Sequence, residues 1–156
     1  MKLTSILFLT LLMSSSSFAL TIDTLGLQAT VTETVSIAVT ALPGASALDL
    51  ETTASDLIIA SVNEKSNSNT GYKVNVKSTN LGALKRSGGT ETFGYSLKLG
   101  STAIDLSTVA GQTINHPSAA LADVTNDVKI SYTGVSNATM VEGTYVDTVT
   151  YTISVI

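Results

Sequence analysis

The sequence predicts an all-β protein folded as a two-layer sandwich. Apolar and polar residues alternate over short runs rich in Thr and Val, which is the period of a half-buried strand. Clusters of Gly, Asn and Ser separate these runs, as turns separate strands. No segment after the first 19 residues sustains the 3.6-residue period of a helix. About seven short strands in one domain are typical of an immunoglobulin-like sandwich.

The first 19 residues have the three parts of a secretory signal peptide. Lys2 precedes a short apolar run from Ile6 to Met13, and Ser17-Phe18-Ala19 has the small residues of a cleavage site. The apolar run is shorter than the roughly 20 residues that a membrane-spanning helix needs. We therefore expect cleavage after Ala19 and export from the cytoplasm.

The composition excludes several classes of function. Without Lys2, the eight basic residues become seven against 12 acidic ones, so the mature chain has a formal net charge of −5. A mildly acidic chain with scattered charges has no electrostatic reason to bind nucleic acid or to insert into an anionic membrane. The absence of cysteine excludes disulfides, thiol nucleophiles and thiolate metal sites.

The front of the mature chain carries the clearest strand pattern. Its apolar alternation is broken only at Glu33, so we expect two strand pieces joined near that residue. Pro43-Gly44 then predicts a turn. The apolar positions of this run share one face: Leu25, Leu27, Ala29, Val31, Val35, Ile37 and Val39.

Two further strands and a loop are predicted next. The apolar run 57–62 and the alternating run 72–76, joined by polar residues, predict a hairpin with a long tip. Residues 81–92, which include Gly88-Gly89 and lack apolar alternation, predict a mobile loop.

The second half begins with another alternating strand over residues 93–99. Gly100-Ser101 predicts a two-residue turn into a returning strand at 103–106. Residues 107–126 contain Gly111, Pro117 and mixed small residues, and they predict a loop. A strand at 128–132 follows.

The last strand is the second strong signal. The run from Tyr145 to Ile156 contains one charge, Asp147, and no proline or glycine, so an unpaired edge here would recruit another strand. The front run has the same property. Either the two ends pair within one closed sandwich, or the N-terminal strand of one subunit completes the sheet of the next. The second arrangement does not close on itself and generates a filament.

Both ends resemble a known family. Residues 143–154, GTYVDTVTYTIS, resemble the C-terminal strand of chaperone-usher pilins and spore-coat-U-type domains. Residues 27–37, LQATVTETVSI, are similar to the donor strand and following strand of disulfide-free pilins of the alternate and archaic classes. The chain differs from many archaic and spore-coat relatives because it lacks a cysteine pair.

The resemblance implies an immunoglobulin-like sandwich that lacks its final strand and is completed by donor-strand exchange. A periplasmic chaperone would fill the groove first, and the N-terminal extension of a neighbouring subunit would replace it at an outer-membrane usher. Residues 1–19 would then be the signal peptide, 20–32 the donor strand and 33–156 the sandwich. The implied donor side chains are Leu25, Leu27, Ala29 and Val31. The implied groove residues are Val149, Tyr151, Ile153 and Val155.

The expected function is that of a structural subunit in a surface fibre, a pilus or fimbria for adhesion or biofilm, joined head to tail to identical subunits. The alternative is a monomeric secreted sandwich that binds carbohydrate or a surface ligand. We expect no enzyme and no cofactor, because the single histidine, His116, lies in a polar segment. Asp123 and Asp127 lack the alternating ligand spacing of a calcium loop, so no metal site is expected.

Overall fold

The computed structural model describes residues 21–117 and 121–156. The predicted signal peptide, residues 1–19, lies outside the described residues. The chain divides into two units, with the boundary between Val31 and Thr32. The second unit, Thr32–Ile156, contains eleven strands and two short 3-10 helices in its described residues, so the predicted all-β fold class is confirmed.

The first unit has no strand or helix in its described residues, 21–31, so of the two strand pieces expected on either side of Glu33 only the second, at Val35–Ala41, is a strand. Every one of these side chains is exposed, including apolar ones that would normally be buried. This segment is called the tail below.

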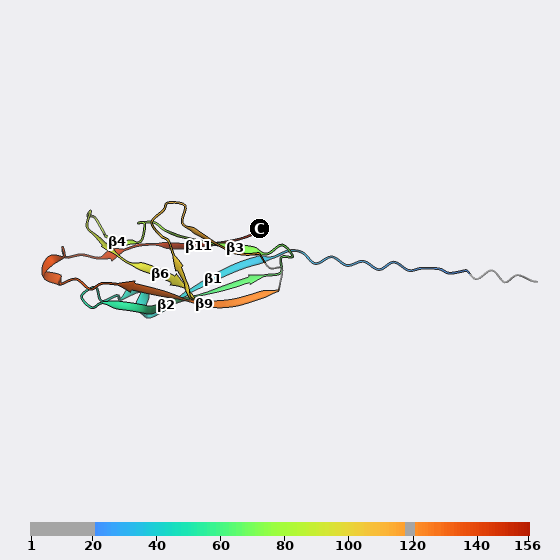
Figure 1. The fold of residues 1–156 in the computed structure, drawn as a ribbon, viewed down its shortest axis with the longest axis horizontal. Coiled ribbons are helices and arrows are strands. Elements are labelled where there is room, and N and C mark those ends of the chain that lie inside the picture. The colour runs from blue at the N-terminus through green and yellow to red at the C-terminus, as the bar shows by residue number, and fades with distance from the viewer. Residues whose placement is uncertain (1–20, 118–120) are drawn as a thin grey trace, which may run out of the picture. The chain divides into compact units, whose positions relative to one another are not determined.

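One layer of the second unit is a five-stranded antiparallel sheet. Figure 1 shows β2 and β9 side by side in this layer, with β1 next to β2. In spatial order the strands are β1 (Val35–Ala41), β2 (Ala54–Ser66), β9 (Ala122–Tyr132), β6 (Ser96–Leu99) and β7 (Thr102–Ile104). The 3-10 helix η1 (Pro43–Ser46) follows β1, at the predicted Pro43-Gly44 turn.

The facing layer contains two smaller antiparallel sheets. The first is β11 (Val149–Val155), β3 (Tyr72–Ser78) and β8 (Gln112–His116), with β3 in the centre. The second is β10 (Tyr145–Val146), β4 (Ala83–Arg86) and β5 (Thr92–Gly94). The 3-10 helix η2 (Asn137–Thr139) lies in the connection before β10.

The strand order is that of an immunoglobulin-like sandwich without its last strand. In such a fold strands A, B, E and D form one sheet, and C, F and G form the other. Here β1, β2, β9 and β6 occupy the positions of A, B, E and D, while β3 and β11 occupy those of C and F. Among the described residues no strand occupies the position of G beside β11.

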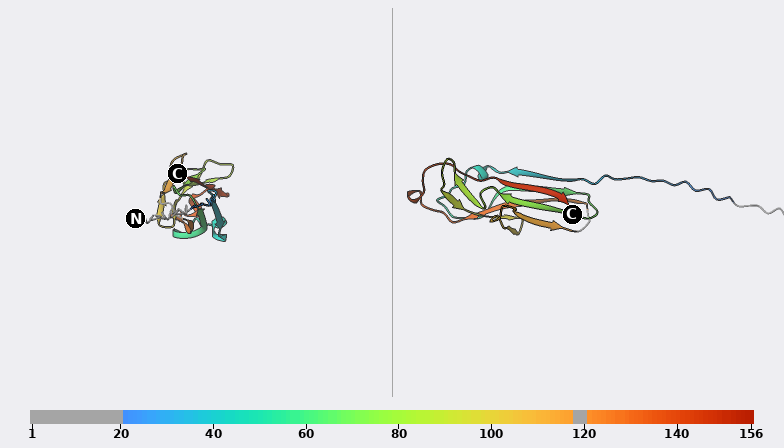
Figure 2. Two further views of the ribbon diagram at one scale, coloured as in Figure 1. Left: turned by 90° about the vertical axis from the view of Figure 1, so that its right-hand side faces the viewer. Right: turned by 90° about the horizontal axis from the view of Figure 1, so that it is seen from above.

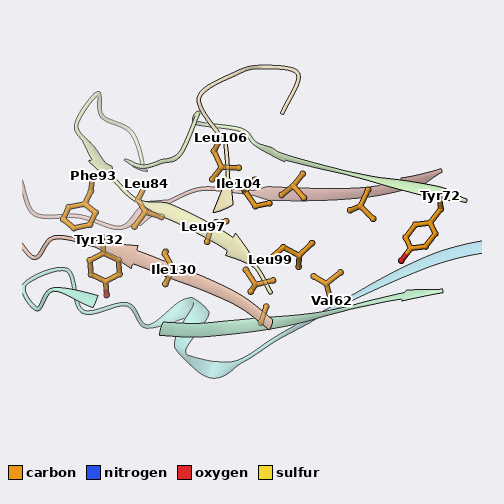
Figure 3. Close-up of a cluster of buried hydrophobic side chains, with 14 residues drawn as sticks. Val62, Tyr72, Leu84, Phe93, Leu97, Leu99, Ile104, Leu106, Ile130 and Tyr132 are labelled. Carbon is orange, nitrogen blue, oxygen red and sulfur yellow. The ribbon is translucent and has the colours of Figure 1, made fainter. Parts of the chain in front are cut away.

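The core lies between the two layers and is formed by alternate residues of the central strands. Val62 on β2 and Val74 and Val76 on β3 are completely buried. Figure 3 shows Val62, Leu97, Leu99 and Ile130 from one layer pointing toward the facing layer. Phe93 meets Tyr132 edge to face, with ring centroids 5.5 Å apart.

The predicted hairpin of residues 57–76 is wrong. β2 and β3 belong to different layers, and residues 67–71 cross between them. β2 also runs further into the polar segment than its apolar residues indicate, because Glu64 and Ser66 face inward and are buried. Alternation identifies a strand, but it does not identify the sheet in which the strand pairs.

The predicted loop at residues 81–92 is also wrong, because it contains the β4–β5 hairpin. Leu84 from this hairpin is buried in the core. Arg86 donates a hydrogen bond of 2.7 Å to Glu91, and this bond lowers the pKa of the Glu91 carboxyl to about 2. A hairpin with a packed leucine and an ion pair is ordered without long apolar alternation.

Of two predictions for the second half of the chain, one is confirmed and the other is partly wrong. Gly100 has a φ of +60° and joins the paired residues Leu99 and Thr102, so the predicted two-residue turn is confirmed. The predicted loop at 107–126 is wrong in part, because β8 pairs with β3 and β9 begins at Ala122. β8 was missed because its central residue, Ile114, is only half-buried among polar neighbours.

Candidate subunit interface

The tail presents apolar side chains at alternate positions. Leu25, Leu27 and Val31 are 85 %, 87 % and 84 % exposed, and Ala29 between them is exposed as well. In a strand such alternate residues point to one face. A segment of this kind can add one apolar face and one polar face to an existing sheet, and the polar face here would carry Thr24, Gln28, Thr30 and Thr32.

A second feature lies within the sandwich, where β1 and β11 run next to each other at the edges of the two layers. β1 is paired only with β2, and β11 only with β3. No backbone pairing joins β1 to β11 in the described residues. We call the line between Val35–Ala41 and Val149–Val155 the seam; Figure 2 (right) shows the two strands along it.

The apolar residues along the seam are incompletely buried. Val35 and Ile37 on β1 and Val149, Tyr151 and Ile153 on β11 pack against the core but are only half-buried. Their partners across β3 are completely or almost completely buried, since Tyr151 pairs with Val76 and Ile153 with Val74. The seam therefore has unpaired backbone groups on both sides and half-exposed apolar side chains.

A cleft continues the seam at the end where β1 finishes and β11 begins. One part has a volume of about 570 Å³ and is lined by η1, Leu84 and the residues around β10. An adjoining part of about 520 Å³ is lined by residues 48–51 and by Met140 and Val141. Tyr145 lines both parts. The cleft mixes Leu, Met and Tyr surface with the carboxylates of Asp49 and Glu51.

Asp147 fixes the start of β11. Its carboxylate accepts hydrogen bonds from the Ser78 hydroxyl at 2.6 Å and the Tyr95 hydroxyl at 2.5 Å. It also accepts one from the Asn80 backbone N–H at 3.0 Å. Burial and the hydrogen bond between the Tyr95 hydroxyl and the Asp147 carboxylate raise the pKa of Tyr95 above its usual value. In the sequence Asp147 is only the one charge of the last strand, and no local pattern indicates that it divides β10 from β11.

The structure places the residues implied by the resemblance in two groups. The four donor residues lie on the tail, where all are exposed. The four residues expected to line the groove lie on β11 and are half-buried, and three of them, Val149, Tyr151 and Ile153, pack against the core. Burial raises the pKa of Tyr151 to about 12. No sequence pattern indicates that β1 forms the other side of the seam, because β1 and β11 come from opposite ends of the sandwich unit's sequence.

A polar cluster inside the sandwich, between the two layers, could not be recognised from the sequence. Glu64 on β2 is completely buried and accepts a hydrogen bond from the Tyr72 hydroxyl at 3.1 Å. The His116 Nε2 lies 3.6 Å from the same carboxylate, and the His116 ring stacks on Tyr72 with centroids 4.5 Å apart. Desolvation and the contact with Glu64 raise the pKa of Tyr72 to about 12. The expectation that His116 lies in a polar loop is wrong, because it ends β8.

No helix in the described residues is long and apolar enough to span a membrane. In residues 21–117 and 121–156, no three or more His, Asp or Glu side chains come together in a way that could hold a metal ion.

No protein-family model matches the sequence. No curated protein matches it either. Four chains of solved structures are similar to it. One is the Escherichia coli Hda pilus minor tip subunit, HdaB, which is 11% identical, with 76% of this chain and 79% of that chain covered and a TM-score of 0.39.

Proposed function

We propose that this protein is a structural subunit of a surface fibre. Residues 20–32 of one copy would add as a strand to the seam of a second copy, between its β1 and β11. Each added strand leaves the tail of the next subunit free, so the contact repeats without closing and produces a filament.

One observation carries the proposal: the same chain holds an exposed apolar segment and an unpaired pair of strand edges. Edges of this kind are usually covered, shortened or charged in natural proteins. The β11 strand has none of these protections, since Val149–Val155 contains no charge, proline or glycine. Strand addition would pair the backbone groups on both sides of the seam and bury the half-exposed side chains.

The chemistry of the two surfaces is complementary. Each leucine or valine that moves from water into an apolar seam contributes about 1.5–3 kcal/mol. Each backbone hydrogen bond of the new ladder contributes about 0.5–1.5 kcal/mol. As an added strand, the tail would place its apolar residues on one face, toward the seam, and its threonine and glutamine side chains on the other face, toward solvent.

The proposal implies further partners and a location. A subunit with an open seam exposes a surface prone to aggregation, so we infer a periplasmic chaperone that covers the seam before assembly and an outer-membrane usher where subunits are exchanged. The assembled fibre would lie on the cell surface and act in adhesion or biofilm formation. The inferred class is that of disulfide-free chaperone-usher pilins.

The alternative function is a monomeric secreted binding module. The observation that favours it is the cleft around Tyr145, whose two parts have volumes in the range of small-ligand sites. A carbohydrate could stack on the tyrosine ring and hydrogen-bond to Asp49 or Glu51. A binding module of this kind would need neither the tail nor the open seam.

The test is assembly of the exported full-length protein, followed as a ladder of oligomers on a gel of unboiled surface material. Substitution Val31→Asp should reduce assembly at least about 100-fold, because an unpaired charge in an apolar seam costs several kcal/mol. Deletion of residues 20–31 should abolish the ladder while the sandwich still folds.

The matched control is Thr30→Asp, which adds the same charge one residue earlier, on the opposite face of the tail. Assembly of this variant should be close to that of the wild type. Equal loss in both aspartate variants, or a wild-type protein that remains monomeric at all concentrations, would contradict the fibre proposal and favour the binding module.

A further inference from the structure

The backbone at the junction of tail and sandwich is held by side chains from the β2–β3 connection. The Asn67 side chain donates a hydrogen bond to the Thr32 carbonyl at 2.9 Å and accepts one from the Thr34 N–H at 2.6 Å. The Asn67 N–H donates to the Thr34 carbonyl at 3.1 Å. The Ser68 hydroxyl donates to the Glu33 carboxylate at 2.5 Å. We call these four hydrogen bonds the exit clasp.

The exit clasp extends the pairing of β1 and β2 beyond the end of the ladder. Val35 pairs with Ser66, so Thr34 and Asn67 are the next pair in the same register. The Asn67 side-chain amide replaces the backbone partner that a longer strand would supply. It binds the carbonyl of Thr32 and the N–H of Thr34, the residues before and after Glu33. Ser68 is only 2 % exposed, whereas Glu33 is exposed, so the hydrogen bond between them is partly shielded from water. Residues 32–34 consequently continue the line of β1.

A tail that filled the seam of its own molecule would need the chain to reverse its direction at residues 32–34 instead of continuing the line of β1. Only residues 32–34 separate the tail from β1, so a tail lying beside β1 would have to form a tight antiparallel hairpin with it. Tight hairpin turns require residues with positive φ, normally Asn, Asp or Gly. The sequence here is Thr32-Glu33-Thr34, and none of the three has positive φ. Such a hairpin would also break the exit clasp.

A barrier of this kind matters because closure within one molecule would otherwise be favoured. A segment tethered by three residues has an effective concentration in the millimolar range at a nearby site. A free neighbouring subunit at micromolar concentration could not compete. A subunit without a barrier would therefore close on itself and leave no seam for a neighbour.

We propose that the exit clasp prevents the tail from entering the seam of its own molecule and so reserves the seam for a second copy. This inference rests on the proposed function, because it assumes that the tail can bind a seam. It assigns Asn67, Ser68 and Glu33 a role in the direction of assembly.

The experiment compares two release variants of the full-length exported protein. Asn67→Ala removes two of the four hydrogen bonds, those of the Asn67 side chain with Thr32 and Thr34, and keeps the backbone bond. Glu33→Asn combined with Thr34→Gly removes the carboxylate and introduces an Asn-Gly turn at the hinge. In both, hydrogen exchange of residues 21–31 should slow at least about tenfold in dilute protein, and the oligomer ladder should weaken by a similar factor.

The matched control is Asn75→Ala, since the Asn75 side chain donates to the Ala110 carbonyl and the Thr113 hydroxyl, away from the tail junction. This variant should exchange and assemble like the wild type. Circular dichroism establishes that each variant is folded. If Asn67→Ala is unstable, the double variant Glu33→Asn with Thr34→Gly still tests the proposal.

The outcomes separate the two proposals. If the wild type assembles and both release variants keep a rapidly exchanging tail and a normal ladder, the exit clasp has no such role. If the wild type does not assemble, the proposed fibre fails, while exchange of residues 21–31 still shows whether release lets the tail enter its own seam.

Discussion

At the scale of single residues, Glu64 shows how a charge is held in the core. A buried carboxylate is stable only when hydrogen-bond donors replace water around it. Tyr72 supplies one donor, and His116 and Asn126 approach the same group. These side chains come from β3, β8 and β9, so the cluster links strands of both layers.

The first residue-scale prediction compares two tyrosines. Tyr72→Phe removes a donor to the buried carboxylate and should lower the free energy of unfolding by about 1.5–3 kcal/mol, the range for hydrogen bonds to charged groups. Tyr132→Phe is the matched control, because its hydroxyl donates to the neutral Asp49 carbonyl at 3.0 Å. That substitution should cost about 0.5–1.5 kcal/mol. Urea unfolding measures both, and a larger loss for Tyr132→Phe would contradict this explanation.

At the scale of elements, β11 depends on the residue that precedes it. Asp147 interrupts the apolar run and binds the end of β3 through Ser78 and the β5–β6 junction through Tyr95. The contact sets where β10 ends and where β11 begins. The seam therefore has a defined starting point, next to the cleft lined by Tyr145.

We predict that Asp147→Ala lowers the free energy of unfolding by about 2–4 kcal/mol, since several charge-assisted hydrogen bonds are lost and buried donors remain unpaired. Glu142→Ala is the matched control, because Glu142 is an exposed acid in the neighbouring connection, between η2 and β10. Its effect should stay within about 0.5 kcal/mol. Thermal unfolding followed by circular dichroism distinguishes them, and equal effects would show that Asp147 does not anchor β11.

At the scale of the whole molecule, no strand in the described residues joins β1 to β11, so the sandwich is open along the seam. The central strands β2, β3, β6 and β9 bury apolar residues completely or almost completely in the core, whereas the seam leaves apolar surface half-exposed. Filling the seam would complete the strand set of the immunoglobulin-like fold. Stability of the subunit should therefore depend on what occupies the seam.

A peptide of residues 20–32 should raise the melting temperature of a subunit that lacks residues 20–31. A ligand that binds only the folded state stabilises it by about 2.7 kcal/mol at 100 times its Kd. The rise should amount to several degrees and increase with peptide concentration. The same peptide with Val31→Asp should have little effect. An unchanged melting temperature with the wild-type peptide would mean that the seam does not accept the tail.

Strand positions and their faces could be predicted from the sequence because they depend on local alternation. The alternation of Tyr151 and Ile153 predicts the strand β11 without reference to the rest of the chain, whereas the same pattern at Leu25, Leu27 and Val31 lies in a segment that forms no strand. The turn at Gly100 was predictable for a similar reason, because its positive φ is a local requirement.

Only the tertiary structure decided which strands pair and which polar residues are buried. β2 and β3 are neighbours in sequence but lie in opposite layers, and β1 meets β11 from the other end of the chain. Glu64 and Asn67 look like ordinary polar residues until Tyr72 and Thr34 are brought to them. Alternation depends on one residue and its near neighbours, whereas pairing and burial depend on contacts between distant segments, which no local pattern contains.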